Sequence, residues 1–212
     1  MNYGQLPKVI GHTEVNCPEM MFYQYLPIKL SGSADVKVEK RLLYFDTIIG
    51  KILCDYIGTF GLDMFFNNNI YLSCKRMWQD KNIQFNRAGF HSDSFMSEDI
   101  NYLWSDSDPT IFNKSNFRLT QDDSFSLIQM TQQARKVNDV TYPNNSILRL
   151  NQYVIHKVND QIDSGHMRTF VKVSFSKDRY DLIGNAHNYE LDYNWEMKPR
   201  KVERNIPHGN VK

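Results

Sequence analysis

The chain has 212 residues, a net charge of +1 at pH 7, and a composition that is 41% hydrophobic and 13% aromatic. Such aromatic content and charge balance exclude a disordered chain, and nothing in the overall charge marks a nucleic-acid-binding protein. No window approaches about 18 consecutive apolar residues, so we expect no membrane-spanning helix.

The three cysteines are scattered along the chain and form no CxxC pair. A thiolate zinc site is therefore not expected, and we expect a reducing, intracellular (cytoplasmic) compartment. Cys54 falls in an apolar helical pattern, which predicts a buried free thiol. The N-terminal segment lacks the basic start and the sustained apolar run of a signal peptide.

Residues 1–33 look irregular, with short strands expected near 20–30. One strong helix signal follows over 35–60, where Asp35 is a possible cap and Gly58 or Gly61 a possible end. Charged residues alternate there with apolar residues that recur at helical spacing, namely Leu42, Phe45, Ile48, Ile49, Ile52, Leu53, Tyr56 and Ile57. This helix has a single apolar face and needs a partner surface.

The remainder of the chain is rich in strand signals separated by turn residues. Residues 121–137 fit either a strand or a short helix. Alternating or β-rich runs bounded by turn signals predict strands over 69–78, 100–105, 146–158 and 167–176. One long helix followed by many strands indicates a β-sandwich or barrel with a helix on one side.

We expect one domain with three parts. Residues 1–66 would form an irregular segment and a buttressing helix, 67–180 the β core, and 181–212 a covering extension. The core contains the stretch "AGFHSDSF", in which His91 and Asp93 are two residues apart. On a strand this spacing places both side chains on one face, so together they are candidate metal ligands.

A third ligand is needed from elsewhere, and His156 is the preferred candidate because it ends the alternating run "LNQYVIH". His187 is the second choice, because Arg200 follows it at a similar distance to the arginine that follows His156. His166 is the third choice. His12 and His208 lie in irregular tails, where we expect them to be solvated.

His91-Ser-Asp93, then His156, then Arg168 twelve residues later resembles the Fe(II)- and 2-oxoglutarate-dependent oxygenase superfamily. The resemblance covers about residues 69–176. It implies a double-stranded β-helix (a cupin-like jelly-roll barrel) buttressed by the helix of residues 35–60. It also implies that His91, Asp93 and His156 bind Fe(II) inside one end of the barrel.

The resemblance further implies that Arg168 binds the distal carboxylate of the co-substrate 2-oxoglutarate, because a guanidinium matches a carboxylate in a bidentate manner. Many members carry a serine two residues after this arginine, whereas this chain has Phe170. We therefore expect help from Tyr102, or from Lys75 or Arg76, of which only one can face inward.

The implied activity is that of a dioxygenase that uses O₂ and converts 2-oxoglutarate to succinate and CO₂ while it hydroxylates, or oxidatively demethylates, a substrate. The substrate class stays open between a small metabolite, a nucleotide or nucleic-acid base, and a protein side chain. The alternative is a catalytically silent jelly-roll protein of the same fold with a binding or structural role.

Overall fold

The computed structural model of the protein describes residues 2–81 and 88–200. Its strands and helices are β1 (Lys8–His12), β2 (Met21–Lys29), η1 (Lys40–Phe45), α1 (Asp46–Asn67), β3 (Asn69–Gln79), β4 (Ile100–Ser105), β5 (Ile111–Asn113), α2 (Asp123–Gln133), η2 (Lys136–Asn138), β6 (Asp139–Val140), β7 (Ser146–Leu150), β8 (His156–Lys157) and β9 (His166–Ser176).

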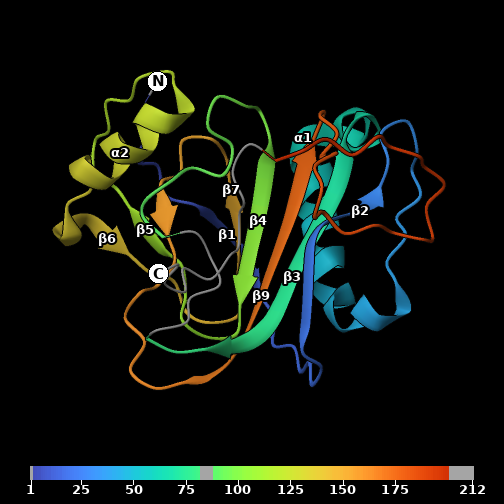
Figure 1. Ribbon diagram of the computed structural model, residues 1–212, viewed down its shortest axis with the longest axis horizontal. Helices are drawn as coiled ribbons and strands as arrows, with labels where there is room; N and C mark the ends of the chain where they lie inside the picture. Colours follow the sequence, from blue (N-terminus) through green and yellow to red (C-terminus); the bar gives the residue numbers. More distant parts are fainter. Residues whose placement is uncertain (1, 82–87, 201–212) are drawn as a thin grey trace.

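The strands form two antiparallel sheets, shown in Figure 1 with α1 at the right and β5, β6 and α2 at the left. The larger sheet has the order β1-β7-β4-β9-β3-β2, and the smaller has the order β6-β5-β8. The expectation of a mainly β protein with a flanking helix is confirmed. Within the described ranges, the two sheets remain separate and do not join into a closed barrel.

The antiparallel pairs are nested within one another along the sequence. The outermost pair is β3 with β9, and inside it His91 bridges His156. Next comes β4 with β7, and the innermost pair is β5 with β6. The chain from β3 to β9 is therefore wound like one long hairpin folded across two sheets.

The two faces of the larger sheet have different neighbours. Alternate residues of β9, Val171, Val173 and Phe175, belong to the main hydrophobic core together with the buried side of α1. Tyr56 of α1 stacks on Phe175 with ring centroids 3.7 Å apart. The intervening residues of β9, such as Lys172, project from the opposite face of the sheet. This second face is the one that carries the candidate site.

The helix differs from its expected bounds of 35–60. Residues 40–45 form the short 3₁₀ helix η1, α1 runs to Asn67, and Asp35 caps neither helix. Gly61, at φ 86°, interrupts α1 rather than ending it, because glycine adopts this left-handed conformation without a steric penalty. The prediction of a buried Cys54 is wrong: its thiol is exposed, since it projects away from the face that carries Ile52 and Tyr56.

Two further segments depart from simple strand patterns. Residues 121–137 contain α2, whose start is fixed by Asp122, since its carboxylate accepts hydrogen bonds from the Ser124 and Phe125 amides. The expected strand over 146–158 is divided into β7 and β8. A turn at Asn151, whose carbonyl accepts a hydrogen bond from Val154, carries the chain from the larger sheet to the smaller one.

Residues 181–200 pack on the N-terminal part of the chain. The buried side chain of Asn188 donates to the carbonyl oxygens of Pro27 and Lys37, at 2.8 and 3.0 Å. The rest of the expected extension, from residue 201 onward, lies outside the described residues. Among the helices of the described ranges, none has the length and apolar character that a membrane crossing requires.

Candidate metal centre

His91 and His156 are brought together by the backbone. Each residue's amide donates to the other's carbonyl oxygen at 2.9 Å, forming an antiparallel bridge at the first residue of β8. Directly opposed residues project to the same side of a sheet. The two imidazole ring centroids consequently lie 4.6 Å apart, with both side chains largely buried.

Asp93 completes the group from two residues after His91. Its carboxylate lies 3.8 Å from Nε2 of His91 and 3.5 Å from Nε2 of His156. One possible ligand atom from each of the three residues lies within 4.8 Å of the others. Two imidazoles and one carboxylate in this arrangement form a facial donor set that suits a divalent transition metal.

The tautomer of His91 suits metal binding. Nδ1 of His91 lies 3.0 Å from the carbonyl oxygen of Gly89, which only accepts, so Nδ1 carries the proton and Nε2 is the ligating nitrogen. Nδ1 of His156 is buried and has no hydrogen-bond partner within the described part of the chain.

Lys172 reaches this group from the other sheet. Its Nζ lies 2.9 Å from Oδ2 of Asp93, the oxygen that also faces His156. Burial by itself would raise the pKa of Asp93, but the Lys172 charge and the hydrogen bond from His156 outweigh it and hold that pKa well below its usual range. Asp93 is thus an ionised carboxylate, which is the form that binds a metal.

The segment that carries Asp93 is fixed by a buried chain of hydrogen bonds. The amide group of Asn101 on β4 donates to the Ser94 hydroxyl at 2.5 Å and accepts from the Ser174 hydroxyl at 2.6 Å. On the other side of Asp93, the Ser92 hydroxyl donates to the carbonyl oxygen of Gln152 at 2.8 Å. These bonds hold the ligand segment between the two sheets.

Replacement of Asn101 by alanine is expected to lower the free energy of unfolding by about 2 to 3 kcal/mol, because two buried hydroxyls lose their partner. Ser174→Ala, which removes one of the two bonds, should cost less. Urea unfolding of both variants measures the difference. Equal stability of the Asn101 variant and the native protein would contradict this role.

The structure separates the three residues that were expected to help bind 2-oxoglutarate. Lys75 on β3 faces the metal group, and its ammonium interacts electrostatically with Lys172, Arg168 and Asp93. Its neighbour Arg76 faces the other way, donating to Thr169 Oγ1 at 2.7 Å. Tyr102 lies on the α1 side of the sheet, where its hydroxyl donates to Asp55 at 2.8 Å, so it does not join the group.

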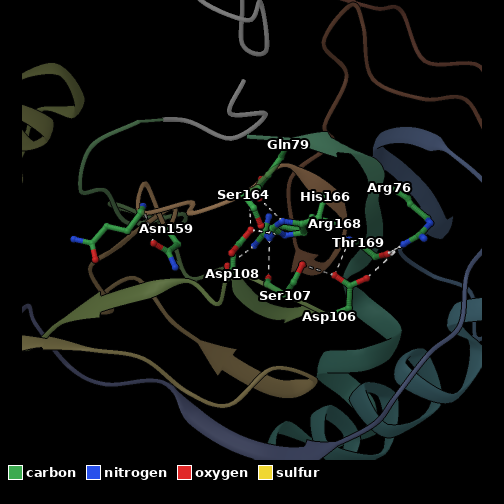
Figure 2. A network of polar contacts seen from close by, with 11 residues as sticks. Arg76, Gln79, Asp106, Ser107, Asp108, Asn159, Ser164, His166, Arg168 and Thr169 are labelled. Carbon is green, nitrogen blue, oxygen red and sulfur yellow. Dashed lines mark hydrogen bonds and ion pairs between the residues drawn. The ribbon is translucent and has the colours of Figure 1, made fainter. Parts of the chain in front are cut away.

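Arg168 lies on the same face of β9 as Lys172 but is held by the loop after β4. Its Nε donates to the Ser107 carbonyl at 2.9 Å and its Nη2 to the Asp108 carbonyl at 3.1 Å. Figure 2 shows His166 beside the Asp108 carboxylate, 2.8 Å away. Arg168 is therefore both a candidate for the co-substrate and an anchor of this loop.

The other histidines that the structure describes lie apart from the metal group. His166 pairs with Asp108, and His187 packs between the rings of Tyr189 and Tyr193. His12 ends β1 at the edge of the larger sheet, and His208 lies outside the described residues. The preference for His156 over His166 and His187 agrees with this geometry.

The sequence interpretation missed Lys172, Asn101 and the two serines beside Asp93. Lys172 is the polar residue between Val171 and Val173 of β9, and Asn101 is the second residue of β4, a strand that is otherwise apolar at its centre. A polar residue at an inward-facing strand position was the available signal. Its partner could not be identified without knowing which strands face one another.

The donor set, the proton on His91 Nδ1 and the ionised Asp93 together fit a divalent metal ion. The group found among the described residues has no cysteine, and Asp93 is its one acidic member, so it provides a mixed nitrogen and oxygen environment rather than a thiolate one. Comparison with protein-family models, with curated proteins and with solved structures finds no match, so the chemistry of the site is inferred from its own geometry.

Proposed function

We propose that the protein is a non-heme Fe(II)- and 2-oxoglutarate-dependent dioxygenase with a double-stranded β-helix fold. The single observation that carries this proposal is the buried His91, Asp93 and His156 group. Two histidines and one carboxylate leave open positions on an octahedral ion, which this class of oxygenase requires for co-substrate and O₂.

The order of the strands supports the proposed fold. Nested antiparallel pairs that pass between two facing sheets are the topology of a jelly roll. The metal group lies on the second nested pair, where His91 and His156 oppose each other between the sheets. Strands on both sides thus hold the ligands rigidly, as a catalytic metal centre needs.

The chain also offers a cation, Arg168, for the distal carboxylate of 2-oxoglutarate. Arg168 and Lys75 both face the space between the sheets and interact electrostatically with each other. When bound, Fe(II) and 2-oxoglutarate would supply, by reaction with O₂ as the oxidant, the chemistry that hydroxylates, or oxidatively demethylates, the substrate. The role of Arg168 is to bind and orient the co-substrate, and the role of the buried wall is to exclude water.

Anaerobic addition of Fe(II) and 2-oxoglutarate is expected to produce a weak visible charge-transfer band in the native protein. Under air, the same mixture should release succinate slowly, and faster when the correct substrate is added. Candidate substrates are screened as nucleosides, oligonucleotides, peptides and amino acids. A protein that binds Fe(II) but shows neither the band nor succinate would not be an oxygenase of this class.

One observation favours the alternative, a catalytically silent binding protein of the same fold. Lys172 already supplies a positive charge at Asp93, so the carboxylate is balanced without a metal. Calorimetric titration with Fe(II) and Mn(II) separates the two functions, because the silent protein would bind neither ion in competition with the lysine.

A further inference from the structure

On the basis of the oxygenase function proposed above, we infer that Lys75 and Lys172 form an anion-binding position for a carboxylate group of the primary substrate. The two lysines project from neighbouring strands into the same space. Ser73 is opposite Lys172 in the register of β3 and β9, and Lys75 follows two residues later on the same face.

The two ammonium groups repel each other in a buried setting. Lys172 is 7% exposed, and burial together with the charges of Lys172 and Arg168 lowers the pKa of Lys75 to about 8. Like charges held together at low dielectric cost free energy. A bound anion would relieve this repulsion, and charge-assisted hydrogen bonds from two ammonium groups would hold it firmly.

The net charge of the site with a metal ion and 2-oxoglutarate bound shows why this anion would be a second molecule and not the co-substrate. A metal ion would engage Asp93, which is the carboxylate at 2.9 Å from Lys172. The positive charges would then be those of a divalent ion and two lysines, and the negative charges those of Asp93 and the two carboxylates of 2-oxoglutarate. The sum of these charges is positive, which favours a substrate that brings a negative charge of its own.

Aromatic side chains indicate what the anion is attached to. Nζ of Lys75 lies 5.0 Å from the ring centroid of Phe22, and Nζ of Lys172 lies 5.5 Å from that of Tyr25. Both rings come from β2. A register shift between Tyr23 and Leu26 changes the direction in which the side chains of this part of the strand point. The ring of Phe22 is 43% exposed, so it forms an accessible edge to the position.

The position therefore combines two cations, a candidate metal and aromatic walls, and it suits a small carboxylic acid with an apolar or aromatic body. Benzoate is a suitable probe, and benzamide is its uncharged counterpart of the same shape. Binding is measured by calorimetry on the protein loaded anaerobically with Fe(II) and 2-oxoglutarate. Benzoate is expected to bind about ten-fold or more tightly than benzamide.

Lys172→Met and Lys75→Met should each remove the preference for benzoate, and Lys172→Arg should retain part of it. Lys177→Met is the matched control, because Lys177 is exposed and pairs with Glu98 on the surface. Circular dichroism melting of each variant checks that it is folded. Equal binding of benzoate and benzamide, or a preference that survives both methionine variants, would overturn the assignment.

A titration of 2-oxoglutarate distinguishes the two sources of a carboxylate. Binding of benzoate together with 2-oxoglutarate supports a separate substrate position. Displacement of benzoate by 2-oxoglutarate, with weakened co-substrate binding in Lys172→Met, would overturn it and assign the lysines to the co-substrate. Failure of the proposed oxygenase function would appear separately, as a native protein that binds no Fe(II).

Discussion

His156→Ala is expected to lower the affinity of the protein for Fe(II) by about 100-fold or more, because removal of even a hydrogen-bond partner of a ligand can cost 10- to 100-fold. The loss should be large because the imidazole of His156 is one of the three candidate ligands. Two backbone hydrogen bonds hold it directly opposite His91, and its Nε2 faces the Asp93 carboxylate. No other histidine in the described ranges lies near enough to replace it. Anaerobic calorimetry with Fe(II), and with Mn(II) as a stable substitute, measures the change.

His166→Ala is the matched control for this variant. His166 lies ten residues farther along the chain and pairs with Asp108 outside the metal group. Its removal should leave Fe(II) affinity unchanged within about two-fold, as expected for a site that shares no partner with the ligands. If the two alanine variants bound Fe(II) equally well, His156 would not be a metal ligand.

Arg168→Met is expected to lower the free energy of unfolding by about 3 kcal/mol, because the carbonyl oxygens of Ser107 and Asp108 lose buried, charge-assisted hydrogen bonds. The loss also leaves Asp108 and Asp106, which attract the guanidinium, without that charge. Urea unfolding gives the magnitude. Arg118→Met, at an exposed position, serves as control and should change stability by less than about 0.5 kcal/mol.

The same variant also tests the role of Arg168 in co-substrate binding. If the guanidinium holds a carboxylate of 2-oxoglutarate, the folded variant should bind 2-oxoglutarate about ten-fold or more weakly while its Fe(II) affinity is retained. Arg168→Lys keeps the charge but loses the planar fork, so it should recover only part of the affinity. Full retention of 2-oxoglutarate affinity in both variants would restrict Arg168 to the anchoring of the loop.

Much of the β structure could be predicted from the sequence because its strands are strongly patterned. The run "INYLWS" and the alternation of Val171, Val173 and Phe175 correspond closely to β4 and β9. Prediction was weaker where tertiary contacts decide the outcome. The helix was placed too early, because apolar spacing does not distinguish the 3₁₀ turn of residues 40–45 from an α-helix.

The residues of the candidate site also fall into those that local spacing predicts and those that tertiary contacts decide. His91 and Asp93 are linked by their local spacing, and an alternating strand pointed to His156. Tyr102 was placed wrongly relative to the metal group. Strand alternation shows that the side chains of Tyr102 and Leu103 point to opposite faces of β4, but it does not show which of these faces meets α1. A shift of one residue reverses every side chain on a strand, and the pairing partners set that register.

The sequence by itself determined the mainly β character, the flanking helix and the three candidate ligands, because these depend on residue type and on spacing within single segments. Only the tertiary structure decided that Lys172 meets Asp93, that Lys75 lies beside it, and that Arg168 anchors the loop of Ser107 and Asp108. Those contacts join strands far apart in the chain, and their formation depends on the nested pairing of the two sheets.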